Sequence, residues 1–141
     1  MMIEKLTKAT EEALGDINVL LRQLSERVPL CTSELLKSIV ENDSLELWVA
    51  KDGERIVGMG ELAIVRKPEG IIAQAEDIVV DEKQRGQGIG KMLSEKLIER
   101  ARAQGARVIQ LSSRPSRLAA NELYQKLGFK SHETNSYYLN L

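Results

Sequence analysis

One segment of this 141-residue chain leaves little freedom in how its middle can fold: Ile78–Lys91, with the sequence IVVDEKQRGQGIGK. An apolar run typical of a buried strand leads into three glycines at alternate positions, Gly86, Gly88 and Gly90, and an amphipathic pattern follows at once. Glycine lets the backbone turn tightly and approach a ligand closely. The segment therefore predicts a strand, a glycine-rich turn and a helix in immediate succession.

The turn has the properties of an anion-binding site. The first turn of a helix presents N–H groups without helical partners and the positive end of the helix dipole, which together suit a pyrophosphate. Lys83, Arg85 and Lys91 add positive charge here to a chain whose net charge is −1. Glycine spacing by itself also describes a turn that only tightens a strand–helix junction.

Two common nucleotide-binding loops do not fit this segment. A P-loop ends in Gly-Lys-Ser/Thr, whereas Lys91 is followed by Met92. A dinucleotide fingerprint places its third glycine three residues after the second and an acidic residue at the end of the next strand. Here the third glycine comes two residues after the second, and the expected next strand ends in Leu111-Ser112. A nucleotide ligand would therefore have to be of another kind.

Composition narrows the class of protein. Hydrophobic residues make up 43% and charged residues 29%, which is ordinary for one soluble domain over residues 1–141. The near-zero net charge gives no support to nucleic acid as a partner. Cys31 is the only cysteine, so an intrachain disulfide or a cysteine-built metal site is excluded, and we predict no metal site. No apolar run is long enough to span a bilayer and the first residues are unlike a signal peptide, so we expect a cytoplasmic protein without membrane contact.

Hydrophobic periodicity and turn residues predict the order β-α-α-β-β-β-α-β-α-β, a mixed α/β sheet with helices packed on it. Asp52-Gly53 is a strong hairpin signal, and Gly105 stands where the helix after the glycine-rich turn should end. The first two expected helices are 11–25, capped by Thr10, and one through about Val40, capped by Thr32 or Ser33. A third follows the four-residue repeat of Ile89, Leu93, Leu97 and Ala101, and a fourth, capped by Ser116, runs to Leu127. The expected strands are 2–6, 45–51, 55–66, 71–80, 107–112 and 137–141.

Three stretches resemble the GCN5-related N-acetyltransferase (GNAT) superfamily. Arg85–Gly90 matches its Arg/Gln-x-x-Gly-x-Gly/Ala signature, Ala75–Asp81 looks like its fourth strand, and Ala120–Phe129 is similar to its C-terminal helix with a Tyr-x-Lys-x-Gly-Phe ending. The element order fits over the whole chain, while motif-level similarity is confined to residues 73–130. The resemblance implies the acyl-CoA N-acyltransferase fold: a mostly antiparallel sheet splayed between its fourth and fifth strands and flanked by about four helices.

The resemblance also implies that acetyl-CoA, as acetyl donor, enters the gap between those strands. Its pantetheine arm would pair with the backbone of Ile78, Val79 and Val80, Asn121 would contact the arm, and Tyr124 would point at its sulfur. Asn121 and Tyr124 are three residues apart and therefore share a helix face. The same pattern is also found for a tyrosine that only packs in the core and an asparagine that only faces solvent. The N–H groups expected to hold the pyrophosphate are those of Arg85, Gly86, Gln87, Gly88, Ile89, Gly90 and Lys91.

The implied chemistry is attack of a neutral amine on a thioester, which calls for a base. We favour Glu76, with Asp77 second. A bound water as the base stays open, and so does a role for these acids as salt-bridged or merely exposed side chains. Strand alternation separates these two side chains unless a bulge intervenes. Val79 N–H is the family-based oxyanion donor. His132 is a further possible base, but we expect it to be an exposed residue of the last strand.

The acceptor is the least constrained part of this interpretation. Family resemblance assigns its walls to residues of about 24–36 and 131–139, and the stretch around Glu76 is similar to that of hexosamine-phosphate N-acetyltransferases. We expect the primary amine of a small molecule. Acetylation of a protein lysine or N-terminus, and a non-catalytic acetyl-CoA sensor, are the alternatives. Arg114 and Arg117 could bind an acidic acceptor, bind the CoA phosphates or be solubilising charge. A homodimer is a family-level expectation only.

Overall fold

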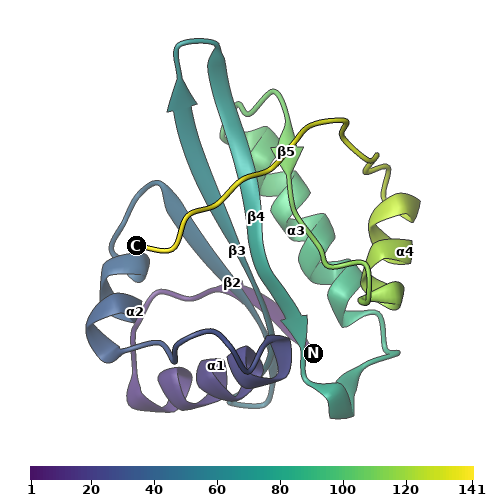
Figure 1. Cartoon of the computed structure of the whole chain (residues 1–141). Helices are drawn as coiled ribbons and strands as arrows, with labels where there is room; N and C mark the ends of the chain where they lie inside the picture. The colour runs from purple at the N-terminus through teal and green to yellow at the C-terminus, as the bar shows by residue number, and fades with distance from the viewer.

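The computed structural model describes residues 1–141 as a five-stranded sheet with helices on both faces (Figure 1). The strands lie in chain order, antiparallel except for a parallel β4–β5 pair. The predicted hairpin after β2 is present, with Asp52 as the last residue of β2 and Gly53-Glu54 as the turn, and Pro68-Glu69 forms the turn between β3 and β4. The strands are β1 Met2–Lys5, β2 Leu45–Asp52, β3 Arg55–Lys67, β4 Gly70–Val80 and β5 Ile109–Gln110.

Two of the four helices begin at the predicted caps. The Thr10 hydroxyl accepts a hydrogen bond from Ala13 N, and Thr32, not Ser33, accepts one from Leu35 N, both at 3.1 Å. The prediction of Ser116 as a cap is wrong: the last helix follows Arg117, which caps it without a side-chain bond. The helices are α1 Glu11–Leu24, α2 Ser33–Val40, α3 Ile89–Ala103 and α4 Leu118–Lys126, with a short 3₁₀ turn, η1, at Glu82–Gln84.

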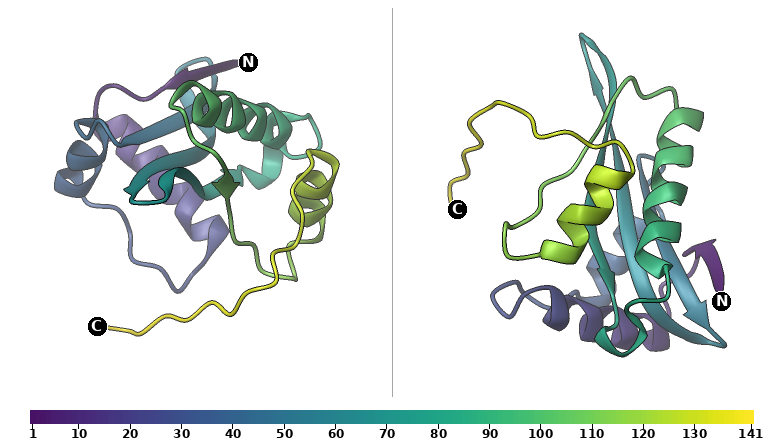
Figure 2. Two further views of the ribbon diagram at one scale, coloured as in Figure 1. Left: turned by 90° about the horizontal axis from the view of Figure 1, so that it is seen from above. Right: turned by 90° about the vertical axis from the view of Figure 1, so that its right-hand side faces the viewer.

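The core is divided by the sheet into two layers (Figure 2). On one face α1 and α2 bury side chains such as Leu20 and Leu36 against Met59 and Val79. On the other face α3 and α4 cover the sheet. There α3 packs so closely on β3 that a Cβ added at Gly60 would stand only 3.1 Å from a methyl group of Leu97.

One half of β4 has a free edge. The parallel pairing with β5 joins only Ala73 to Ile109 and Gln74 to Gln110. From Ala75 to Val80 no strand pairs with β4 on this side. The sheet is therefore open between its fourth and fifth strands, as the resemblance to the GNAT superfamily implies.

The strand predicted at Tyr137–Leu141 is wrong. These residues form no regular element, every residue from Lys130 onward is exposed, and the segment runs clear of the sheet (Figure 2, left). An alternating apolar pattern becomes a strand only where another strand offers backbone partners. The predicted strand at 107–112 is likewise reduced to the two residues that find partners on β4.

Candidate active site

The glycine-rich turn has the conformation that an anion site needs. Gly86 and Gly88 both have φ of 82°, in the left-handed region, and Gly88 is the N-cap of α3. The first backbone N–H bond of the helix is that of Met92 to Gly88 O, at 3.0 Å. No backbone N–H of residues 85–91 donates a hydrogen bond within the chain. Seven consecutive amides are thus free to bind an anion.

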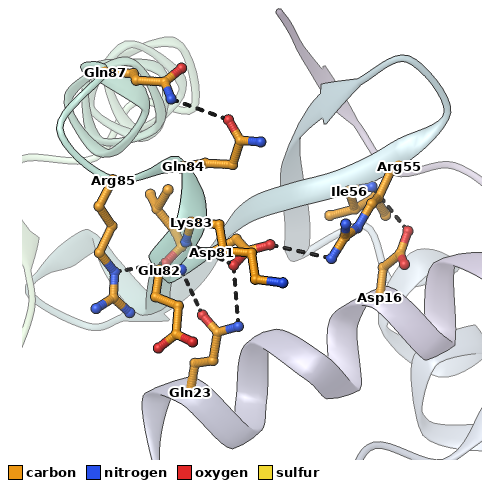
Figure 3. A network of polar contacts seen from close by, with 11 residues as sticks. Asp16, Gln23, Arg55, Ile56, Asp81, Glu82, Lys83, Gln84, Arg85 and Gln87 are labelled. Carbon is orange, nitrogen blue, oxygen red and sulfur yellow. Dashed lines mark hydrogen bonds and ion pairs between the residues drawn. The ribbon is translucent and has the colours of Figure 1, made fainter.

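A buried carboxylate fixes the junction between β4 and this turn. Asp81 is 3% exposed and accepts hydrogen bonds from Lys83 N at 3.1 Å and from the side chains of Gln23 and Arg55 at 3.3 Å (Figure 3). Mainly because of the Lys83 amide, the pKa of Asp81 is lowered. Gln23 also accepts from Glu82 N at 2.9 Å. The turn is therefore anchored to α1 and β3.

The left-handed glycine should matter for binding. Gly88→Ala introduces no clash, since nothing lies within 4 Å of the added Cβ. It does place an alanine at a φ that costs about 1–2 kcal/mol. Relaxation of that strain would misdirect the free amides, so we expect acetyl-CoA to bind about 10-fold more weakly in a calorimetric titration. Gly53→Ala, at φ of 63° in the distant β2–β3 turn, carries similar strain and should leave this affinity unchanged.

A β-bulge in β4 brings the two candidate base residues to one region. Met59 pairs with Val79 and Glu61 with Glu76, so β4 has one residue more than β3 between these pairs. Asp77 is at the bulge with φ of 51°, the only non-glycine residue with positive φ. Ala75 and Ile78 consequently face the same core layer, which unbroken alternation would forbid.

Three carboxylates meet at this bulge. Glu61 of β3 lies directly opposite Glu76, and Asp77 is next to it. Glu76 and Asp77 are exposed and Glu61 is half-buried. Partial desolvation nevertheless raises the pKa of each, with the charges of Asp77 and Glu76 adding to the rise at Glu61 and that of Asp77 adding to the rise at Glu76. A carboxylate with a raised pKa is a better proton acceptor. None of the three takes part in an ion pair.

Beside the bulge lies a cavity of about 240 Å³ between the sheet and the first two helices. Its walls are apolar side chains of α1, the α1–α2 loop, α2, β2 and β3, and its only charged lining residues are Glu61 and Asp77. Glu76 does not line it, and neither does any residue of the 131–139 segment. Of the two segments predicted to wall the acceptor, residues 28–36 line this cavity and residues 131–139 do not.

Helix α4 places Tyr124 at the open edge of β4. Tyr124 is buried, and its ring packs edge-on against Phe129 with centroids 5.9 Å apart. Burial raises the pKa of Tyr124, and the guanidinium of Arg117 opposes the rise. Asn121 lies on the same helix but turns its amide to Arg114 O, at 3.0 Å.

The two arginines before α4 bind backbone carbonyls. Arg117 donates to Ile78 O at 3.0 Å, bridging the open edge of β4, and Arg114 donates to Leu24 O at 2.7 Å, at the end of α1. The sequence left their roles open. In the structure they tie the segment before α4 to the rest of the chain.

Sequence reasoning missed Glu61 and did not assign a role to Asp81. A lone glutamate in an alternating strand gives no signal, because its importance depends on which residue of β4 lies opposite. Asp81 stands in the sequence only as the last residue of the Ala75–Asp81 motif, which does not indicate its hydrogen-bond partners. His132 is exposed and lies in no strand.

None of the helices has the length and apolar character that crossing a bilayer would require. No three His, Cys, Asp or Glu side chains are grouped so that they could hold a metal ion.

The profile of the "Acetyltransferase (GNAT) family" matches residues 16–129. Human N-acetyltransferase 8 is 35% identical over 108 residues, covering 72% of this chain and 46% of that protein. Glucosamine 6-phosphate N-acetyltransferase of Trypanosoma brucei brucei is 40% identical over 82 residues, covering 56% and 54%. The chain spans about half the length of the curated relatives it matches.

A solved structure extends the similarity to the whole chain. The crystal structure of a Trypanosoma brucei acetyltransferase superposes with a TM-score of 0.78 at 31% identity, over 99% of each chain. Residues 16–129, which the family profile matches, include the bulged β4, the free amides of residues 85–91 and helix α4. From these similarities and the shared fold, the chain is a member of the GNAT acetyltransferase family.

Proposed function

We propose that this chain transfers an acetyl group from acetyl-CoA to the primary amine of a small molecule, by direct attack in a ternary complex. The observation that carries the proposal is the arrangement around β4. Its open edge leads to seven free amides at residues 85–91, and the cavity with carboxylates lies at its bulge. Donor and acceptor sites thus meet at one strand.

The donor site fits the chemistry of acetyl-CoA. The amides of residues 85–91 would hold the pyrophosphate, and the unpaired edge at Ile78, Val79 and Val80 would pair with the pantetheine arm. Asn121 would contact that arm. Because Arg117 donates to Ile78 O, the arm would have to displace or share this bond. When bound, acetyl-CoA supplies an acetyl group activated as a thioester.

The acceptor needs a base. A primary alkylammonium of pKa about 10.4 must lose a proton at neutral pH, which costs about 4–5 kcal/mol. Glu76 is the base that the sequence suggests. Asp77 is the candidate that the cavity favours, because it lines the cavity at the strained bulge residue. Val79 N–H is the proposed donor to the oxyanion.

The cavity favours a small acceptor over a protein segment. Its volume of about 240 Å³ is below the usual range of small-molecule pockets, about 300–1,000 Å³. The names of the diaminobutyrate and glucosamine 6-phosphate acetyltransferase relatives also point to small amines.

The proposal is tested by following free CoA while acetyl-CoA is incubated with the chain and with alkylamines, arylalkylamines, amino sugars and lysine peptides in turn. Release above the hydrolysis rate with a small amine supports it. Release with peptides alone would support protein acetylation. Tight acetyl-CoA binding without release from any acceptor would make the chain a sensor.

Tyr124 is proposed to donate a proton to the departing thiolate. Because a thiol of pKa about 8.5 leaves fairly well unaided, we expect Tyr124→Phe to lower kcat by about 10- to 100-fold, less than a full general acid supplies. Steady-state kinetics at saturating acetyl-CoA measures this. The phenyl ring keeps the packing on Phe129, so the melting temperature should stay unchanged. Tyr137→Phe, at an exposed tyrosine, is the matched control. An unaltered kcat in Tyr124→Phe would remove the tyrosine from the mechanism.

A further inference from the structure

We infer that the acceptor is a primary amine with an apolar body whose only charge is its ammonium group. The inference rests on the proposed function and deepens it. It excludes amines that also carry a phosphate or a carboxylate, and so separates the acceptor of this chain from the acids named in its diaminobutyrate and glucosamine 6-phosphate acetyltransferase relatives. The feature that carries it is the charge of the cavity between the sheet and the α1–α2 region.

The cavity combines apolar walls with negative charge at one end. Ten of its 13 lining residues are hydrophobic, among them Leu21, Leu36 and Met59. Its charged residues, Glu61 and Asp77, stand together at the β4 bulge, and no lysine, arginine or histidine lines it. An ammonium group would meet the carboxylates, and the rest of the molecule would meet mostly apolar side chains.

The nearest arginines do not change this balance. Arg22 donates to the carbonyls of Glu26 and Val28, within the α1–α2 loop, and Arg114 donates to Leu24 O. Arg22 thus contacts the backbone of Val28, a lining residue, from outside the cavity, and neither arginine side chain is itself part of the lining. A phosphate or carboxylate in the cavity would lose its hydration without gaining a cation.

Electrostatics opposes an anion a second time. Glu61, which is half-buried, and Asp77, which is exposed beside the cavity, would both repel it. The same two groups attract an ammonium. Glu61, on β3 and across from Glu76, is in a position to orient the amine toward the proposed base. We assign Glu61 as a positioning residue for the acceptor.

The first test uses acceptor pairs that differ in one anionic group. We expect kcat/KM for 2-phenylethylamine to exceed that for phenylalanine by about 100-fold or more, and glucosamine to exceed glucosamine 6-phosphate. Equal or higher kcat/KM for the anionic member of both pairs would overturn the inference and leave the proposed function intact. Acetyl-CoA binding with no CoA release from any amine would instead overturn the proposed function.

A second test adds the missing cation. Leu35 lines the cavity and is 52% exposed, so Leu35→Arg can be accommodated at the rim. We expect it to shift the phenylalanine to 2-phenylethylamine ratio of kcat/KM about 10-fold toward phenylalanine. Val19→Arg, at an exposed position of α1 outside the cavity, should leave the ratio unchanged. An identical ratio in both folded variants would contradict the assignment of this cavity.

A binding measurement separates the role of Glu61 from turnover. In calorimetry with the chain saturated by free CoA, Glu61→Gln should weaken 2-phenylethylamine binding about 10-fold and leave CoA affinity unchanged. A purely structural role would weaken both ligands together. Unchanged amine binding would overturn the role of Glu61.

Discussion

Replacing Asp77 by asparagine is expected to lower kcat by about 100- to 10,000-fold, with acetyl-CoA affinity close to that of the parent chain. Asparagine keeps the size of the side chain and tolerates the positive φ of this position, so the bulge should persist. What is lost is the carboxylate that faces the cavity and would take the proton of the amine. Stopped-flow or steady-state measurement of CoA release, with a calorimetric titration of acetyl-CoA, tests both halves of the expectation.

Glu76→Gln is the matched variant for this prediction. Glu76 lies next to Asp77 but outside the cavity lining. We therefore expect the Glu76→Gln substitution to lower kcat by less than about 10-fold. A larger loss of kcat in Glu76→Gln than in Asp77→Asn would instead identify Glu76, the residue that the sequence favours, as the base. Because burial raises the pKa of Asp77, activity of the parent chain should fall on acidification at a pH above the usual carboxyl range. That acidic limb should be absent from Asp77→Asn.

The largest effect on stability is expected from Arg100→Ala, which should lower the free energy of unfolding by about 3–5 kcal/mol. Arg100 of α3 donates two hydrogen bonds, of 2.8 and 3.0 Å, to Glu46 of β2. Trp48 and Gln104 each donate another at 2.9 Å. The Glu46 side chain is only 3% exposed, so removal of Arg100 leaves a buried carboxylate without its cation. Urea unfolding followed by circular dichroism measures the loss.

The control is Arg102→Ala, on the same helix at an exposed position that makes no ion pair, where a change below about 0.5 kcal/mol is expected. A loss below about 1 kcal/mol in Arg100→Ala would contradict the assigned role. The hydrogen bonds from Arg100, Trp48 and Gln104, together with the charge of Arg100, outweigh burial and lower the pKa of Glu46 from 4.5 to about 2.

The sign of the pH dependence follows from this lowered pKa. Stability from Glu46, on the order of 3 kcal/mol, is fully present above pH 4.5. It is lost as the pH falls from 4.5 toward 2. Chemical denaturation at several pH values should show this decline in the parent chain and a smaller one in Arg100→Ala.

The features that the sequence determined by itself are local. The Thr10 and Thr32 caps, the Asp52-Gly53 turn and the strand–glycine–helix succession at 78–91 all depend on residues a few positions apart. Such interactions are set by backbone geometry and capping chemistry, which a sequence pattern records directly. The family also follows from local segments, because its motifs lie at Ala75–Asp81, Arg85–Gly90 and Ala120–Phe129.

The tertiary structure decided everything that depends on residues far apart in the chain. The β4 bulge exists only relative to β3, and it brings Asp77 beside Glu61, 16 positions earlier. Arg117 finds Ile78 O across the open sheet, and Glu46 finds Arg100 54 positions later. The segment at 137–141 has a strand pattern but no partner. Register, burial and pairing are properties of the assembled sheet, so an alternating sequence cannot specify which acid lines the cavity or which strand forms.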